Sequence, residues 1–165
     1  MRSRMIGGMV ASAALAALVG ACGGGEEEPT TGASSTESTS GGTPGPATAS
    51  GEVAVEAREY AFDNVPQTVE AGDTSFTLSN VGMEEHEMFV VKLAEDATFE
   101  EAIEARGREG TVEEEVGGVR PIKPGEEGDF EAKLTPGDYG MVCALPGPEG
   151  QPHVVLGQRA EFVVE

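Results

Sequence analysis

From Glu52 onward, the chain consists of short runs of alternating apolar and polar residues separated by turn sequences. Val53, Val55 and Ala57 alternate with residues that include the acids Glu52 and Glu56, and Phe76 and Leu78 alternate with Thr and Ser. A period of two places one side of a strand in a core and the other in water. The turn signals are Glu70-Ala71-Gly72-Asp73, Asn80-Val81-Gly82, Lys123-Pro124-Gly125-Glu126 and Thr135-Pro136-Gly137-Asp138. Roughly seven short strands at this spacing predict an all-β fold, a Greek-key antiparallel β-sandwich.

One segment of this region has a helical pattern instead. Thr98 is a suitable N-cap, apolar residues follow at Phe99, Ala102 and Ile103, and Gly107 is a stop signal. We therefore expect one short helix, inserted near 98–106.

The N-terminus has the order of a secretory signal. Arg2 and Arg4 precede an apolar stretch over about 9–19, which is shorter than the ~20 residues of a membrane span. The sequence Val19-Gly20-Ala21-Cys22 resembles the lipobox of bacterial lipoproteins. This resemblance implies that residues 1–21 are a signal peptide removed before Cys22, whose thiol then carries a diacylglycerol. An ordinary signal peptide with an incidental cysteine is the alternative.

Residues 22–51 contain no aromatic residue and, after Cys22, no aliphatic residue larger than Ala. Such a Gly/Ser/Thr/Pro-rich segment buries too little surface to offset the entropy of ordering it. We expect a disordered tether that links the lipidated Cys22 to a folded domain at 52–165. The protein would then be exported and anchored at the outer face of the bacterial cytoplasmic membrane.

The charge balance excludes two classes of partner. The chain has 30 acidic against 10 basic side chains, a formal net charge of −20. Nucleic-acid binding requires clustered Lys and Arg, and anionic lipid repels such a surface. We therefore expect no nucleic-acid partner, membrane contact only through the N-terminal lipid, and an acidic surface suited to basic redox partners.

Both histidines and the second cysteine lie in the predicted domain, at His86, Cys143 and His153. If Cys22 is lipidated, Cys143 is an unpaired thiol in an exported protein, where free thiols are readily oxidised. A metal would fix and protect the thiolate. Two imidazoles and one thiolate are the trigonal ligand set of an electron-transfer copper site with a weak axial ligand.

The segments around these residues resemble a known family. His86, then Tyr139 to Gly147 around Cys143, then Pro152 to Gln158 beginning with Pro152-His153, resemble the signature of the cupredoxins, the type 1 blue-copper proteins. The long loop from Cys143 to His153 resembles that of the blue-copper domain of copper nitrite reductases. The resemblance implies one type 1 copper per chain, held by His86, Cys143 and His153, and single-electron transfer between redox partners.

Two positions depart from the family pattern. Gln158 stands where the family usually has Met, so the axial ligand is either the Gln158 amide, as in the stellacyanin branch, or is missing or replaced by the carbonyl of Glu85. Glu87 stands where an Asn usually braces the cysteine loop, a role that Asn80 could take over. Met88 and Met141 are expected to be core residues.

The same three residues are also compatible with simpler roles. Cys143 could be an ordinary core residue, or His86, Cys143 and His153 could form a structural zinc site, although an amide is an unusual fourth zinc ligand. No pattern for substrate turnover is present, so we expect an electron-transfer or copper-binding protein rather than an enzyme. The acidic runs Glu84-Glu85 and Glu113 to Glu115 are expected to be solvated surface. Alternative functions are a copper-carrying or delivery lipoprotein and a metal-free interaction module.

The redox partner is not identified by the sequence. Apolar residues around His153 would form its docking patch, and electrons would pass through His153 of a monomeric protein. The expected patch residues are Leu145, Pro146, Val154 and Leu156.

Overall fold

The computed structural model describes residues 42–108 and 110–165. The predicted signal peptide, Cys22 and the first part of the predicted tether therefore lie outside the described residues. None of the helices in the described part is long and apolar enough to cross a membrane.

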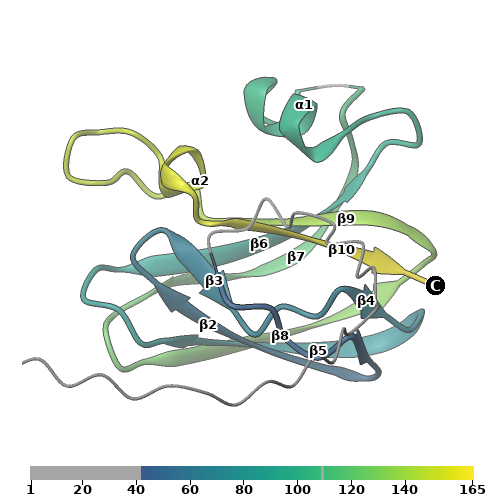
Figure 1. The fold of residues 1–165 in the computed structure, drawn as a ribbon, viewed down its shortest axis with the longest axis horizontal. Helices are drawn as coiled ribbons and strands as arrows, with labels where there is room; N and C mark the ends of the chain where they lie inside the picture. The colour runs from purple at the N-terminus through teal and green to yellow at the C-terminus, as the bar shows by residue number, and fades with distance from the viewer. Residues whose placement is uncertain (1–41, 109) are drawn as a thin grey trace, which may run out of the picture. The chain divides into compact units, whose positions relative to one another are not determined.

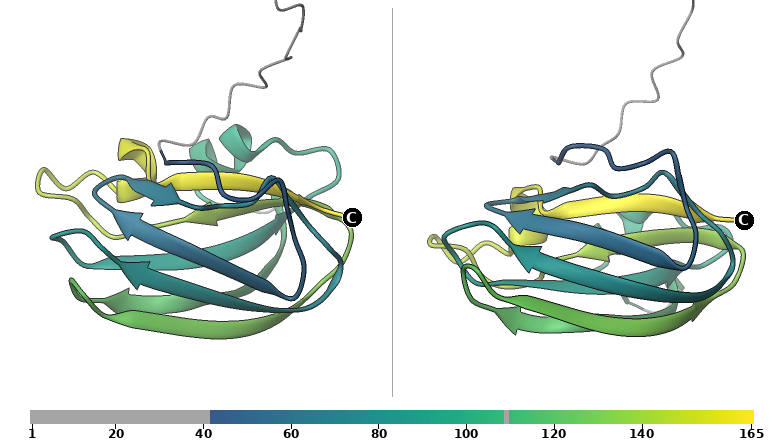
Figure 2. Two further views of the ribbon diagram at one scale, coloured as in Figure 1. Left: turned by 60° about the horizontal axis from the view of Figure 1, so that its bottom comes forward. Right: turned by 90° about the horizontal axis from the view of Figure 1, so that it is seen from below.

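Ten strands form two sheets that pack face to face (Figures 1 and 2). The six-stranded sheet has the order β1-β4-β10-β9-β6-β7, and the four-stranded sheet has the order β3-β2-β5-β8. The strands are β1 (Thr48–Ala49), β2 (Glu52–Arg58), β3 (Ala61–Asp63), β4 (Thr68–Val69), β5 (Gly72–Asn80), β6 (His86–Leu93), β7 (Val112–Ile122), β8 (Glu127–Leu134), β9 (Gly137–Val142) and β10 (Arg159–Val164). The all-β sandwich predicted from the sequence is confirmed.

The sheets are mixed rather than purely antiparallel. Strand β2 pairs in parallel with β5, and β4 pairs in parallel with both β1 and β10, whereas the other pairs between named strands are antiparallel. Between β2 and β5, the chain forms β3 in the four-stranded sheet and β4 in the six-stranded sheet. The chain thus crosses between the layers before β5 returns beside β2.

The core lies between the two sheets and is built from the alternating positions. In β2 the burial alternates at every residue, with Val53, Val55 and Ala57 inside. Phe76 of β5 stacks on Phe130 of β8 with ring centroids 4.9 Å apart. Further core residues are Phe62, Val69, Leu78, Met88, Val90, Leu134, Tyr139, Met141, Phe162 and Val164. The predicted core role of Met88 and Met141 is confirmed, because both are fully buried in this cluster.

The turn between β7 and β8 follows directly from its sequence. The amide of Glu126 donates to the carbonyl of Lys123 over 2.9 Å, and Gly125 has φ +81°. A type II turn requires a positive φ at its third position and commonly has proline at its second, here Pro124. Lys123 to Glu126 therefore turns the chain from one sheet into the other.

The predicted helix is present as α1 (Phe99–Glu104). Thr98 caps it through a capping box with Glu101. Phe99 and Ala102 pack with Leu93 into a small hydrophobic cluster. Figure 1 shows α1 on the outer side of the six-stranded sheet. A second helix, the single turn α2 (His153–Leu156), was not expected from the sequence.

Residues 42–51 differ from the expected tether. They run along the β3 and β4 region, where Gly45 donates to the Val65 carbonyl and Thr68 donates to the Ala47 carbonyl. These contacts use backbone groups rather than apolar side chains, so a hydrophobicity pattern does not reveal them. The ordered chain therefore begins before the boundary at residue 52 that the sequence predicts.

Candidate metal centre

Cys143 and His153 lie at the two ends of one loop that is closed by backbone hydrogen bonds. Cys143 directly follows β9, and His153 is the first residue of α2. The amide of His153 donates to the Leu145 carbonyl, and the amide of Val154 donates to the Cys143 carbonyl, both over 2.8 Å. The Gln158 carbonyl accepts from the Cys143 amide over 3.2 Å. These backbone hydrogen bonds hold Cys143 and His153 side by side.

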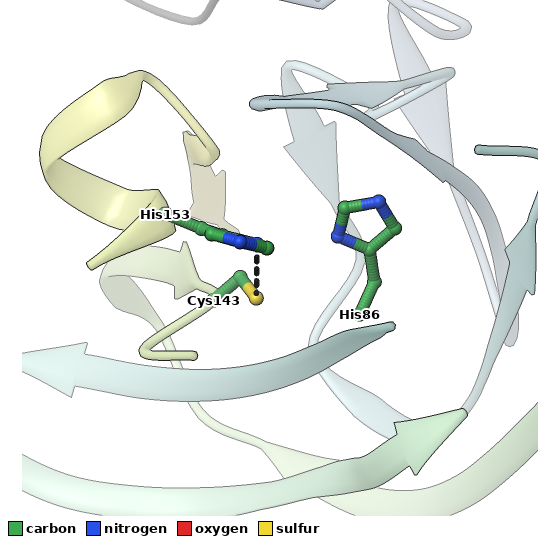
Figure 3. Close-up of side chains that lie close together, drawn as sticks. All are labelled: His86, Cys143 and His153. Carbon is green, nitrogen blue, oxygen red and sulfur yellow. Dashed lines mark hydrogen bonds between the residues drawn. The ribbon is translucent and has the colours of Figure 1, made fainter. Parts of the chain in front are cut away.

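His86 reaches the same place from a distant part of the sequence. It is the first residue of β6 and pairs with Ile122 of β7. The loop before it is held by Asn80, whose Nδ2 donates to the carbonyls of Glu84 and Ile122 over 2.8 and 3.0 Å. Figure 3 shows the His86 ring facing Cys143 and His153 across a small gap.

The three side chains form a compact, buried cluster. One potential ligand atom of each of His86, Cys143 and His153 lies within 4.8 Å of the other two. The Cys143 Sγ is 3.5 Å from His153 Nδ1, and the two imidazole centroids are 5.3 Å apart. The side chains are 0 to 2% exposed. The structure thus brings together the three residues that the sequence selects as ligands.

The fourth predicted residue, Gln158, also lies at this cluster. It is fully buried, and its Oε1 is 3.0 Å from His153 Nδ1. Its Nε2, both ring nitrogens of His86 and the Nε2 of His153 are buried without a hydrogen-bond partner. Buried polar atoms are nearly always paired in native proteins, because an unpaired one costs about 1–3 kcal/mol. Unpaired donors and acceptors in one buried cluster fit a bound metal ion.

The electrostatics favour neutral imidazole and a thiol that needs a cation to ionise. Burial lowers the pKa of His86, and the neighbouring His153 lowers it further. Burial raises the pKa of the Cys143 thiol to about 11. Neutral imidazole is the form that binds a metal, and coordination deprotonates a thiol outright. The donor set therefore fits a thiophilic transition metal.

Glu87, rather than Asn80, braces the cysteine loop. Its Oε1 accepts a hydrogen bond from the Ala144 amide over 3.1 Å, directly after Cys143. The suggestion that Asn80 takes this role is wrong, because the Asn80 side chain forms its hydrogen bonds with the loop before His86 and with β7. The Glu87 carboxylate therefore supplies an oxygen to the residue that directly follows Cys143.

Two further carboxylates and one aromatic ring contact the cluster and were not expected from the sequence. Glu84 Oε2 is 3.3 Å from His153 Nε2, and Glu59 Oε1 is 3.7 Å from His86 Nε2. The ring of Tyr60 packs edge-on against His153 at 5.2 Å between centroids. The expectation that Glu84 is only solvated surface is therefore wrong. Acidic residues in the loops beside a site have no sequence signature that would reveal this placement.

The expected docking patch is partly exposed. Leu145 and Val154 are half-buried, and Leu145 packs against the core, whereas Pro146 and Leu156 are exposed. The structure adds exposed apolar side chains that sequence reasoning did not include. They are Val81, Met83 and Val155, at 55, 88 and 58% exposure.

Comparison with known proteins identifies the fold. The chain is similar to reduced auracyanin from the photosynthetic bacterium Roseiflexus castenholzii, with 22% identity over 74% of this chain and 99% of that chain and a TM-score of 0.50. An azurin from Methylomonas sp. strain J shares 14% identity over 69% of this chain and 97% of its own, with a TM-score of 0.45. Rusticyanin from Thiobacillus ferrooxidans shares 17% identity over 77% of this chain and 88% of its own, with a TM-score of 0.47.

No protein-family model and no curated protein matches the chain. At 22% identity, the likeness to auracyanin shows the fold alone. The chain has the cupredoxin fold, with a buried His-Cys-His cluster that could hold a metal ion.

Proposed function

We propose that this chain is an electron-transfer copper protein that binds one type 1 copper with His86, Cys143 and His153. The observation that carries the proposal is the buried cluster itself, in which the three ligand atoms lie within 4.8 Å of one another and ring nitrogens lack partners. Structural zinc sites normally add a fourth Cys, His or carboxylate ligand, and the buried neighbour here is the amide of Gln158. Gln158, which is fully buried with Oε1 3.0 Å from His153 Nδ1, would be the weak fourth ligand. One thiolate, two imidazoles and a weak axial ligand are the donor set of an electron-transfer copper site.

Copper held there would supply one-electron chemistry by alternating between Cu(II) and Cu(I). The protein contributes a loop that is already closed by backbone hydrogen bonds at both Cys143 and His153. Glu87 fixes the next residue of that loop, Ala144. A preformed ligand frame limits the rearrangement that accompanies electron transfer.

Titration of the purified domain with Cu(II) tests the proposal. We expect one equivalent to produce an intense thiolate-to-copper absorption near ~600 nm, typical of this ligand set. The matched control is Cys143→Ser, which keeps the side-chain shape and should abolish the band. If the wild-type domain gives no such band, electron transfer by copper is ruled out. If Cys143→Ser in addition leaves every biological activity unchanged, a metal-free interaction module is the better description.

Copper delivery is a second candidate function, favoured by one observation. Met83 is 88% exposed, and its backbone amide donates to the Glu59 carboxylate, which faces His86. Thioether sulfur is a ligand that suits Cu(I). A carrier should release copper quickly to a chelator, and Met83→Leu should slow that release. An electron carrier should retain its copper and show reversible voltammetry that Met83→Leu does not change.

The proposed location is the outer face of the cytoplasmic membrane, with Cys22 as the lipid attachment site. The support is the signal-like start and the lipobox-like sequence before Cys22, which lie outside the described residues. We expect the mature protein to begin at Cys22, with the mass of a diacylglycerol added, and to fractionate with membranes. Cys22→Ala should remain unprocessed, whereas a wild-type protein found unmodified and released would contradict the anchor.

The proposed partner is a redox protein with a basic docking surface. This chain would bind it as a monomer. The exposed apolar residues near His153 are Pro146, Val155 and Leu156, and the chain is strongly acidic overall. Leu145 is a poor probe of docking because it also packs against the core. Leu156→Asp should slow electron exchange with the partner while leaving the copper absorption unchanged, and Val163→Asp, on β10, serves as an exposed apolar control.

A further inference from the structure

We propose that Glu59 and Glu84 are positioning residues, each holding one ligand imidazole by its Nε2 so that Nδ1 is presented to the metal. This inference rests on the proposed copper site. It assigns a role to two carboxylates that do not touch the metal-binding atoms themselves.

The contact at His153 is the closer of the two. Glu84 Oε2 lies 3.3 Å from His153 Nε2, and the His153 side chain is only 2% exposed. The opposite nitrogen, Nδ1, faces Cys143 Sγ at 3.5 Å and the Gln158 amide oxygen at 3.0 Å. The ring is therefore oriented between a carboxylate on one side and the ligand cluster on the other.

The contact at His86 has the same arrangement. Glu59 Oε1 lies 3.7 Å from His86 Nε2, which is fully buried. Compared with the ~2.7–3.2 Å of a good N–H···O hydrogen bond, the contact at His153 is longer by about 0.1 Å and the contact at His86 by about 0.5 Å, so the latter is an electrostatic contact rather than a hydrogen bond.

Glu59 also positions Glu84. Its Oε1 accepts hydrogen bonds from the backbone amides of Met83 and Glu84 over 2.5 and 2.9 Å. The residue before them, Gly82, has no room for a side chain, because a Cβ there would lie 2.6 Å from Glu59 Oε1 and 2.9 Å from His86 Nε2. One carboxylate thus orders the loop that places the other, and the glycine lets that loop approach His86.

The chemical consequence follows from the polarity of the contact. A carboxylate facing Nε2 favours the tautomer with the proton on Nε2, which leaves the Nδ1 lone pair free for a metal. It also makes the imidazole a stronger donor, which stabilises Cu(II) more than Cu(I). In the orientation given above, the Gln158 oxygen would pair with a proton on His153 Nδ1, so in the metal-free protein the Nε2–H tautomer requires the Gln158 amide to be turned, with its NH2 group toward Nδ1. The Nε2 of Gln158, which is without a partner in the present orientation, would then donate to Nδ1.

The test compares Glu84→Gln and Glu59→Gln with Glu85→Gln. All three remove one negative charge, but Glu85 is exposed and, within residues 42–108 and 110–165, forms no ion pair with either imidazole. The first readout needs no copper: ¹⁵N NMR of the metal-free protein reports the tautomer of each ring. We expect the Nε2–H tautomer for both rings in wild type, with its population reduced at His153 by Glu84→Gln and at His86 by Glu59→Gln.

The second readout is metal affinity and potential. Loss of such an outer partner typically costs ~10–100-fold in metal affinity, and we expect that loss for Cu(II), with a smaller one for Cu(I). Each tenfold by which the Cu(II) loss exceeds the Cu(I) loss corresponds to a rise of about 59 mV in the potential. Glu85→Gln should change neither affinity by more than about twofold, the level of a screened surface charge.

Two outcomes overturn the inference. One is an Nδ1–H tautomer for both rings in the metal-free wild type. The other is an equal effect of Glu84→Gln and Glu85→Gln, which would mean that overall charge and not position is responsible. If wild type fails to bind copper but shows the expected tautomers and their loss in the variants, the positioning role stands and the proposed copper function falls.

Discussion

Two buried polar groups lie six residues apart in this chain and differ in one respect. Asn80 is 2% exposed, and each end of its amide is paired, with Nδ2 donating to two carbonyls and Oδ1 accepting from Gly82. His86 is 0% exposed, and neither of its ring nitrogens makes a hydrogen bond, the Glu59 carboxylate being 3.7 Å from Nε2. The fold satisfies the group that serves the scaffold and leaves open the group that lies among other potential ligands. A buried polar group with all its partners, such as Asn80, stabilises the fold. A buried polar group without them, such as His86, is available to bind a ligand.

The largest expected effect comes from filling the open cluster. Because copper would bind the folded cluster and not the unfolded chain, free copper at ~1,000 times its Kd should stabilise the domain by about 4 kcal/mol. Denaturant unfolding with and without Cu(II) measures this difference. Cys143→Ser should lose most of it, and an equal gain in wild type and variant would mean that copper acts elsewhere.

The next largest effect is expected from removing the hydrogen bonds of Asn80. Asn80→Ala removes three hydrogen bonds and leaves the buried Ile122 carbonyl without its side-chain donor. We expect a loss of about 3 kcal/mol in the free energy of unfolding, since a buried unsatisfied group costs ~1–3 kcal/mol in addition to the lost bonds. Urea unfolding of the metal-free domain checks this value. The control is Ser79→Ala, in the same strand as Asn80. It removes one exposed hydrogen bond, to Glu127 of β8, and should cost under ~0.5 kcal/mol.

Much of this architecture is readable in the sequence, because local periodicity and turn chemistry determine it. The alternation of Val53, Val55 and Ala57 predicts a strand with one buried face, and β2 has that face. Pro124-Gly125 predicts a turn, and Gly125 has the positive φ that the turn requires. The grouping of His86, Cys143 and His153 follows from their chemical rarity in the domain.

The remainder depends on contacts between residues that are distant in sequence. Asn80 binds the carbonyl of Ile122, 42 positions away, and Glu59 binds the amide of Glu84, 25 positions away. Neither contact leaves a local pattern. Residues near Gly45 are held by backbone pairing with Val65, so a composition typical of disorder conceals an ordered segment. The polar contacts around the cluster are therefore the part that sequence reasoning misses.

A third buried polar group, Asp63, extends the comparison to pH. Arg58 and the Thr43 amide satisfy its carboxylate, and hydrogen bonding from Arg58 is the main reason that its pKa falls from 3.8 to about 2. Because the folded pKa lies below the unfolded value, this stabilisation is complete above about pH 5 and is lost as the pH falls through 2. We expect the loss to be up to ~2 kcal/mol.

Unfolding free energies measured between pH 6 and pH 2 test this expectation. Asp63→Asn should flatten the acid part of the curve, because the variant has no proton to bind at that position. Asp73→Asn changes an exposed carboxyl and is the matched control. An identical acid slope in wild type and Asp63→Asn would show that the Arg58 pair contributes nothing to acid stability.

The smallest expected effect concerns Glu87. Its carboxylate has a hydrogen-bond partner, as Asn80 does, and the residue lies beside the cluster of His86, Cys143 and His153. Its role in the structure is to present one oxygen to the Ala144 amide. Glu87→Gln keeps that oxygen, so the free energy of unfolding should change by less than ~1 kcal/mol and the copper absorption should stay the same. Glu87→Ala leaves the amide unpaired and should cost about 1–2 kcal/mol while broadening the absorption, since the residue after Cys143 is no longer fixed. Denaturant unfolding and the copper spectrum of the two variants separate the outcomes: if Glu87→Gln is as damaging as Glu87→Ala, the negative charge of Glu87, and not its hydrogen bond, supports the cysteine loop.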